Sequence, residues 1–225
     1  MKAMILAAGR GERLRPFTDT LPKPLLMVQG QPLISHHLRK LAALGVKQVV
    51  INHAWLGEVI EQQLSDGRQF GLRIQYSPEP AGGLETAGGI IRALPLLGEQ
   101  PFWVINGDVF TDLNFAELPT TLSDDCDAHL LMVVNPSHHP SGDFALQHGR
   151  LSAKQPQLPS YTYSGMGLFS PRLFAGYQPG SEQRLALRPL FEQAIAQQRL
   201  AATLCHAAWT DVGTPERWQA IARNS

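Results

Sequence analysis

The residues best suited to chemistry lie close to the start of the chain. An apolar run over 3–8 leads into a turn with Gly9 and Gly11, which Arg13 and Lys23 follow. Glycines let backbone N–H groups approach an anion closely, while arginine and lysine neutralise phosphate charge. Because α/β proteins bind nucleotides in the loop after such a strand, we expect this segment to hold a polyphosphate.

A solvated basic loop is the alternative interpretation of this segment. Pro16, Pro22 and Pro24 argue against it, because they stiffen a loop that would gain nothing from rigidity without a ligand. The segment is not a dinucleotide fingerprint, since Leu14 stands where a third glycine would be expected, and it lacks the Gly-Lys-Ser/Thr ending of a P-loop. We therefore favour a nucleotide site of another kind and disfavour a dinucleotide-dependent oxidoreductase.

Two aspartates, distant in sequence, are the candidates for metal binding. Asp108 follows the apolar run over 102–105, and Asp211 stands between a strand-like segment and Gly213. Ligands of open α/β sheets bind outside the carboxyl ends of the strands, and Mg²⁺ prefers carboxylate and phosphate oxygens. Either aspartate alone is more often a cap or turn residue, so the hypothesis depends on both converging on one Mg²⁺.

Two other polar segments each allow two interpretations. The glycine-rich stretch over 84–89 suits contact with a nucleotide base or close helix packing, and its residue types favour neither. The pair 142–143 and the segment 163–165 could line a sugar pocket, although such residues more often form turns and glycine-relieved strands.

The histidines form no recognisable catalytic or metal-binding set. We expect His36 and His37 to face solvent from a helix, and the pair at 138–139 lacks a third zinc ligand. His53, at the end of a predicted strand, is the histidine nearest the expected cleft.

Hydrophobic periodicity predicts the elements that position these residues. Strands are predicted over 3–8, 48–51, 72–76, 102–105, 128–134, 143–148, 161–169 and 200–206, and helices over 33–44, 58–64, 86–94, 185–198 and around Trp218. The third of these helices is expected to end at Pro95. Repeated βα units predict an α/β fold with a mostly parallel central sheet and helices on both faces. No low-complexity linker divides the chain, so we expect a single domain over 1–225.

Composition restricts the partners of the chain. Its 225 residues carry 19 Lys plus Arg and 19 Asp plus Glu, whereas a nucleic-acid or acidic-membrane binder would need a basic excess. Two cysteines make neither a metal motif nor a disulfide framework. No apolar stretch approaches the roughly 18 residues of a membrane span. We expect a cytoplasmic protein, monomeric or a small homo-oligomer, with small anionic ligands and no nucleic-acid or membrane partner.

Several motifs together resemble the sugar-1-phosphate nucleotidyltransferases. The family pattern G-x-G-x-R-L/M-x-P and its P-K-P-L/M continuation match 9–16 and 22–25, and its N-G-D segment matches 106–108. Its L-G-T-A-G-A/G segment is similar to 84–89, its late Y/F-x-Y/F/N-S/A/T-G strand to 161–165, and its W-x-D-V/I-G-T/R-P motif to 209–215. The matches follow one another in order along the whole chain, which makes the combination specific.

The resemblance implies a Rossmann-like, GT-A-type fold with a mixed sheet, and it implies roles for matching residues. Arg13, Lys23, Asp108 and Asp211 would be catalytic, and the two aspartates would hold Mg²⁺. Nucleotide contacts are implied for Ala8, Gly9, Gly11, Glu12, Arg13, Lys23, Glu79, Gly83 and Thr86, and sugar-phosphate contacts for Asn106, Asp143 and Gly165. Many relatives carry Glu-Lys-Pro where this chain has residues 153–156, so Lys154 receives no role.

Within the family, three features resemble the members that join UTP to N-acetylmuramic acid α-1-phosphate. These features are the short chain, the segment 51–57, and Glu85 at a position where most members carry glycine. The alternatives within the family are guanylyl transfer to mannose 1-phosphate and uridylyl or thymidylyl transfer to glucose 1-phosphate. A non-catalytic nucleotide-sensing subunit is disfavoured, because it could lose Arg13, Lys23 or either aspartate, and all four are present.

Overall fold

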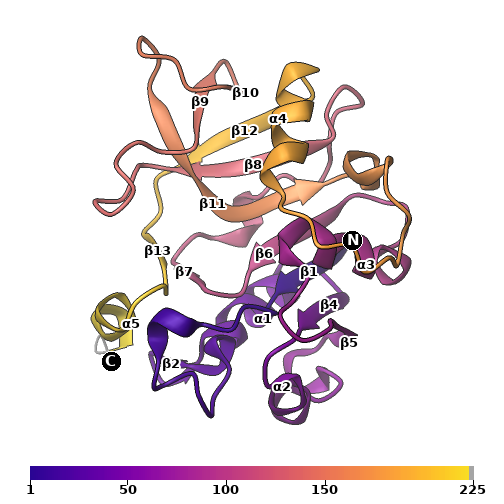
Figure 1. Ribbon diagram of the computed structural model, residues 1–225, viewed down its shortest axis with the longest axis vertical. Coiled ribbons are helices and arrows are strands. Elements are labelled where there is room, and N and C mark those ends of the chain that lie inside the picture. Colours follow the sequence, from indigo (N-terminus) through magenta and orange to yellow (C-terminus); the bar gives the residue numbers. More distant parts are fainter. Residues whose placement is uncertain (223–225) are drawn as a thin grey trace.

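A nine-stranded sheet forms the centre of the computed structural model, which describes residues 1–222 (Figure 1). In spatial order its strands are β5 (Arg73–Pro78), β4 (Gln48–His53), β1 (Lys2–Leu6), β6 (Phe102–Asn106), β11 (Ser160–Phe169), β8 (Ala128–Val133), β12 (Leu200–Cys205), β10 (Arg150–Ser152) and β9 (Phe144–Gln147). The mixed α/β sheet expected from the sequence is thereby confirmed.

The direction of the strands changes at β11. The four strands β5, β4, β1 and β6 are parallel, and their carboxyl ends lie at one edge of the sheet. β11 runs antiparallel between β6 and β8, while β12 is parallel to β8. This change of direction places the carboxyl end of β6 beside the middle of β11, where a ligand could contact both halves of the sheet.

Helices cover both faces of the sheet because its central strands are apolar on both sides. They are α1 (Leu33–Ala43), α2 (Gly57–Leu64), α3 (Glu85–Leu97), α4 (Arg188–Ala196) and α5 (Pro215–Ala222). In β1, Met4 belongs to the core under α3 and α4, whereas Ala3 and Ile5 belong to the core under α1 and α2. Residues 102–105 of β6 alternate between the two cores in the same way.

The helix α3 extends past Pro95, so the predicted stop at that residue is wrong. A proline inside a helix removes one N–H donor and normally leaves the carbonyl four residues earlier unpaired. Here the Ile91 carbonyl accepts a hydrogen bond from the Gly180 N–H at 2.9 Å instead. This contact from a remote loop is invisible to a local sequence pattern.

The helix α4 is shorter than the predicted helix over 185–198, which is also a correction. Leu185 donates its N–H to the Leu84 carbonyl at 2.9 Å and accepts from the Gly88 N–H at 3.1 Å. These hydrogen bonds hold Leu185 against the start of α3, so the helix begins only at Arg188.

The C-terminal segment returns to the N-terminal loop, beside β2 (Met27–Val28) in Figure 1. β13 (Trp209–Asp211) pairs antiparallel with β7 (Val109–Thr111), and α5 follows it. A small core joins Leu14, Leu26 and Val212, with Trp218 packed against it. Separately, among residues 1–222 no helix combines the length and the apolar character that a membrane crossing requires.

Candidate active site

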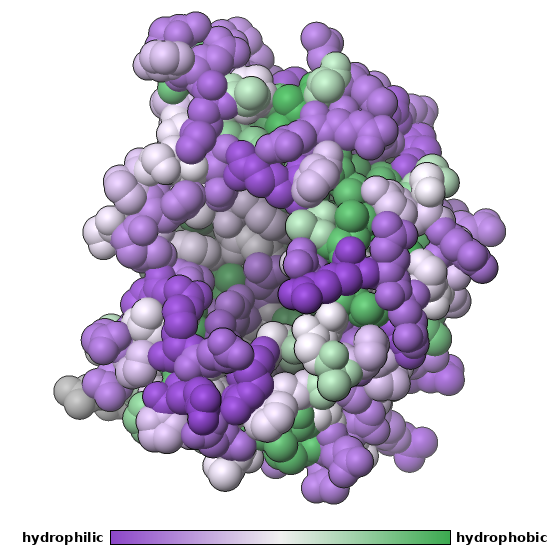
Figure 2. Space-filling model, viewed as in Figure 1, coloured by the Kyte–Doolittle hydropathy of each residue, from purple (hydrophilic) through white to green (hydrophobic). Residues whose placement is uncertain are grey.

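Two adjoining cavities open at the carboxyl ends of the parallel strands. The first, of about 640 Å³, lies over the ends of β1, β4 and β6, and the second, of about 330 Å³, lies between β6, β11 and β13. Asn106 and Asp108 line both. Figure 2 shows a hollow in the middle of the molecule with hydrophilic residues along much of its rim. The volume of the first cavity is typical of a small-molecule site.

The first cavity collects most of the residues with an implied nucleotide role. Those that line it are Ala8, Gly9, Glu12, Lys23, Glu79, Gly83 and Thr86. Gly11 and Arg13 are not among its lining residues, and Arg13 is exposed in a short 3₁₀ turn. The second cavity is lined by Asp143, Gly165 and Asp211 together with Asn106 and Asp108.

The glycine turn is held tightly by Thr18. Gly11 has φ +69°, and a Cβ there would lie 3.0 Å from Thr18 Cγ2. The buried Thr18 hydroxyl donates to the Gly11 carbonyl at 2.8 Å. Glycine is therefore favoured at this position both for its left-handed backbone and for space, and the Thr18 hydrogen bond supports the turn.

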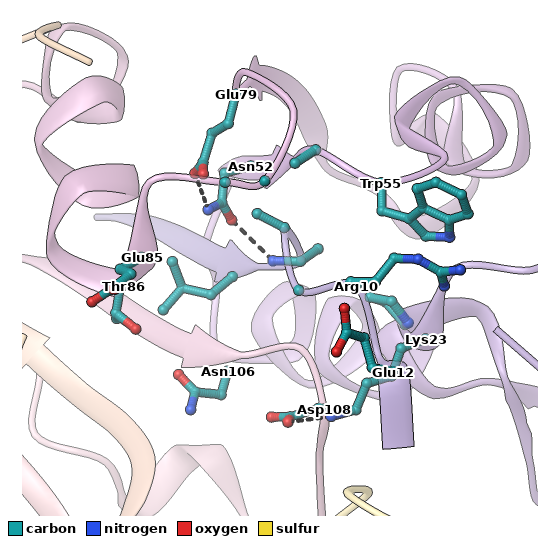
Figure 3. A pocket seen from close by; sticks show the side chains of 18 of the residues that line it. Arg10, Glu12, Lys23, Asn52, Trp55, Glu79, Glu85, Thr86, Asn106 and Asp108 are labelled. Carbon is teal, nitrogen blue, oxygen red and sulfur yellow. Dashed lines mark hydrogen bonds and ion pairs between the residues drawn. The ribbon is translucent and has the colours of Figure 1, made fainter. Parts of the chain in front are cut away.

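Asn52 and Glu79 brace the opposite wall of the cavity (Figure 3). The Asn52 side chain accepts from the Ala7 N–H at 2.9 Å and donates to Glu79 Oε1 at 2.6 Å. Glu79 Oε2 accepts from the Leu84 N–H at 2.7 Å. Because buried polar groups need such partners, this chain of hydrogen bonds fixes the end of β1 relative to the start of α3. The Glu79 carboxylate is thus occupied in holding the segment around Gly83.

Lys23 and Asp108 meet where the two cavities join. Lys23 Nζ lies 2.6 Å from Asp108 Oδ2, and the lysine side chain is largely buried. Lys23 comes from the N-terminal loop and Asp108 follows β6, as Figure 3 shows. The ion pair brings a cation suited to phosphate and a carboxylate suited to a divalent metal to one point.

The pairing of β13 with β7 brings the two predicted metal ligands into one place. Asp211 is opposite Val109 in the register, and the Val212 N–H donates to the Asp108 carbonyl at 2.7 Å. Arg217 Nη1 lies 2.9 Å from Asp211 Oδ1, and His138 Nε2 lies 3.1 Å from the same oxygen. Each of the two carboxylates therefore has a basic side chain beside it.

The donor chemistry fits Mg²⁺ better than a metal bound by protein alone. Within residues 1–222 no group of three or more His, Cys, Asp or Glu could hold a metal. Mg²⁺ commonly uses one or two carboxylates together with substrate phosphate oxygens. Two aspartates beside a cavity that Arg10 and Lys23 also line match that pattern.

Gly165 and Asp143 shape the second cavity. Gly165 has φ +79°, and a Cβ there would lie 2.7 Å from Asn106 Nδ2. The β11 strand is irregular here, with its register to β8 shifted between Tyr163 and Gly167. Asp143 accepts from the Tyr163 N–H at 2.8 Å, and its other oxygen lies 3.1 Å from His139 Nε2. Burial raises the pKa of the Tyr163 hydroxyl above its ordinary value.

Two of the histidines that lie outside the cavities are buried. His53 is buried, and its Nε2 is 2.7 Å from Glu61. His37 is also buried, so the expectation that it faces solvent is wrong. Its Nε2–H donates to the Val109 carbonyl at 2.7 Å, because α1 packs under the strand that follows Asp108. Burial lowers the pKa of His37 to about 4.

Lys154 lies outside both cavities, whereas two residues without a predicted role line the first one. Lys154 donates to the Gly142 carbonyl at 3.1 Å and is not among the residues that line either cavity. Arg10 and Trp55 line the first cavity, although no sequence motif predicted a site role for either. Nothing in their spacing indicates that a loop arginine would stack on an aromatic ring from the segment after β4.

Comparison with known proteins gives both sequence and structural relatives. The nucleotidyl transferase family model matches residues 2–224. The chain is 51% identical to the N-acetylmuramate alpha-1-phosphate uridylyltransferase of Neisseria meningitidis serogroup B, over 95% of this chain and 94% of that protein. It is 32% identical to the enzyme of the same name from Caulobacter vibrioides, over 95% and 92%.

The structural comparison supports the fold. The crystal structure of HddC from Yersinia pseudotuberculosis complexed with GMP-PN superposes with a TM-score of 0.79. The match covers 98% of this chain and 97% of that chain at 21% sequence identity.

Proposed function

Because the chain belongs to the nucleotidyl transferase family, we propose that it transfers UMP from UTP to N-acetylmuramic acid α-1-phosphate. The products are the UDP-sugar and pyrophosphate. The observation that carries this proposal is the 51% identity to a uridylyltransferase of that specificity over nearly the full length of both chains.

The two cavities suggest where each substrate binds. The nucleotide base would lie near Gly83 and Thr86, with its phosphates toward Lys23, and the sugar phosphate would enter the second cavity beside Asp143 and Gly165. Asn106 and Asp108 border both cavities. The attacking phosphate oxygen and the α-phosphorus would therefore meet beside Asp108.

In this reaction the residues of the protein bind, align and neutralise the charged substrates. An oxygen of the sugar phosphate forms a bond to the α-phosphorus, and the bond from that phosphorus to the bridging oxygen of pyrophosphate breaks. A phosphate is already an anionic nucleophile, so no general base is needed. The protein must align two polyanions that repel each other and neutralise charge on the leaving group. We assign Lys23 to the α-phosphate and the attacking group, and the Gly9–Gly11 backbone to the outer phosphates. Arg13, which does not line the cavity, is given no phosphate contact in this arrangement.

Asp108 and Asp211 would hold Mg²⁺ between the nucleotide and the sugar phosphate. When bound, the ion supplies positive charge to phosphate oxygens. Arg217 and His138 contact Asp211 from the other side, and in this proposal they orient its carboxylate.

The proposed substrates also suggest where the protein acts. UTP is a cytoplasmic metabolite and N-acetylmuramic acid is a bacterial cell-wall sugar, so we place the reaction in the cytoplasm, in the reuse of cell-wall fragments. We propose that the chain acts as a monomer or small homo-oligomer on small substrates alone.

A panel of substrates tests the proposal directly. Purified protein with Mg²⁺ is given UTP, dTTP, GTP, CTP or ATP, each with the 1-phosphates of N-acetylmuramic acid, N-acetylglucosamine, glucose or mannose. Pyrophosphate release is measured, and kcat/KM should be highest for UTP with N-acetylmuramic acid α-1-phosphate. A higher kcat/KM for GTP with mannose 1-phosphate, or for a glucose 1-phosphate pair, would overturn it.

A further inference from the structure

Arg10 and Trp55 form a contact that no motif in the sequence indicates. The guanidinium carbon of Arg10 lies 3.7 Å from the centre of the Trp55 ring, a distance typical of a cation–π interaction. Both residues line the first cavity. Figure 3 shows them on the side where Lys23 and Asp108 lie, away from Glu85 and Thr86.

The Arg10 side chain is also fixed by hydrogen bonds. Its Nη1 donates to the Thr18 carbonyl at 2.8 Å, and its Nη2 donates to Asp19 Oδ1 at 3.0 Å. Trp55 Nε1 donates to the same Thr18 carbonyl at 3.0 Å. The hydrogen bond from Arg10 lowers the pKa of Asp19, so this partner stays ionised. These contacts orient the guanidinium along the cavity wall.

These contacts leave donors free for a ligand. A guanidinium has five N–H groups in a planar fork, and the bonds to Thr18 and Asp19 use two of them. The side chain of Arg10 keeps 28% of its surface exposed. A planar cation with spare donors on a cavity wall suits phosphate oxygens, which arginine binds through two parallel hydrogen bonds.

The first cavity is lined by two cations and four carboxylates, so a polyanion would depend on the cations on its own side of the cavity. Arg10 and Lys23 are cations that line the first cavity, while Glu12 and Asp108 are carboxylates on the same side. Asp108 is already paired with Lys23 and Asp19 with Arg10. Arg10 can therefore offset the repulsion from Glu12 at the end of the cavity farthest from the proposed base site.

Resting on the proposed function, we infer that Arg10 binds the β- and γ-phosphates of UTP and that Trp55 is a positioning residue for its guanidinium. Arg13 is exposed in the next turn and does not line the cavity. Arg10 thus makes the main side-chain contact with the outer phosphates.

The affinities for UTP and UMP together test the role of Arg10. Calorimetry would measure Kd for both nucleotides with wild type, Arg10→Ala, Arg10→Lys and Arg15→Ala. Arg10→Ala should weaken UTP binding by about 10- to 100-fold, the loss of a hydrogen bond to a charged group, and change UMP binding by less than about threefold. Arg10→Lys should lie between, because lysine keeps the charge without the fork. Arg15→Ala is the matched control, since Arg15 shares Asp19 but lies outside the cavity lining.

Two variants of Trp55 test the positioning role. Trp55→Leu should weaken UTP binding by about 2- to 5-fold, the scale of an exposed cation–π contact, whereas Trp55→Phe should restore most of it. Trp55→Leu should have no further effect on UTP binding when Arg10 is already replaced by alanine. The ratio of UTP affinity to UMP affinity measures the positioning role separately from any change in protein stability. Circular dichroism confirms that each variant is folded.

Failure of this inference and failure of the proposed function are distinguishable. If wild-type protein binds UTP but does not turn over N-acetylmuramic acid α-1-phosphate, the proposed function is contradicted. The UTP-to-UMP affinity ratio of the Arg10 variants would still test whether Arg10 binds the outer phosphates. Unchanged UTP affinity in Arg10→Ala, or an equal loss of UTP and UMP binding, would overturn the inference. Should Arg10→Ala fail to fold, the same ratio measured with Arg10→Lys decides.

Discussion

Lys23 Nζ lies 2.6 Å from Asp108 Oδ2, which joins the loop after the first strand to the carboxyl end of β6. The two residues are 85 positions apart in the chain. In the proposed reaction Lys23 contacts phosphate and Asp108 contacts Mg²⁺, so substrate binding would separate this ion pair. Substitution of either residue should therefore change the reaction in a measurable way.

The Lys23→Ala variant should lose turnover more than it loses UTP affinity. Lys23 is assigned to charge that develops as pyrophosphate leaves, and an interaction stronger in the transition state affects kcat more than binding. We expect kcat to fall by about 10²-fold or more. Steady-state kinetics with Lys47→Ala, an exposed lysine elsewhere, provides the control; an unchanged kcat in Lys23→Ala would contradict the assignment.

Asp108→Asn and Asp211→Asn should each lower turnover by about 10²-fold or more, the scale of one electrostatic stabiliser. Both substitutions keep the side-chain shape and remove the charge that would bind Mg²⁺. Activity should be measured across a Mg²⁺ titration, with the exposed Asp112→Asn as control. Wild-type activity of either variant at limiting Mg²⁺ would exclude that residue as a metal ligand.

Gly165→Ala should impair the sugar-phosphate side of the site. A methyl group there would come within 2.7 Å of Asn106 Nδ2, and the φ of +79° disfavours alanine. We expect KM for the sugar 1-phosphate to rise by about tenfold or more, with a smaller change for UTP. Gly149→Ala is matched, since Gly149 has φ +76° but the nearest atom to its Cβ would lie 4.0 Å away. Equal effects of the two variants on the sugar KM would mean that backbone strain alone is responsible.

His37 should make the protein less stable in mild acid. Burial lowers its folded pKa to about 4 from 6.5, so the unfolded chain binds the proton first as pH falls. The free energy of unfolding is unaffected by this group above about pH 6.5 and decreases by up to about 1.4 kcal/mol per pH unit between 6.5 and 4. Urea unfolding of wild type, His37→Gln and exposed His206→Gln between pH 7 and 5 measures the slope. The slope should be smaller only in His37→Gln, and equal slopes would contradict the assignment.

Local sequence was sufficient to predict the strands and turns whose conformation depends on neighbouring residues. The apolar runs that precede Gly9 and Asp108 form β1 and β6, since alternate residues in each find an apolar core on either face. The glycine turn was also predictable, because a left-handed backbone at Gly11 requires that residue type. Ordered motifs along the chain indicated the family, which the comparisons confirmed.

Only the tertiary structure decided which distant side chains meet. The Gly180 contact allows α3 to continue through Pro95, and α1 buries His37 beneath β7. Pairing of β13 with β7 places Asp211 beside Asp108, and the folded loop directs Arg10 rather than Arg13 toward the cavity wall formed with Trp55. Sequence spacing determines residue type and local backbone preference, but the approach of side chains from separate elements depends on how the whole sheet and its loops pack.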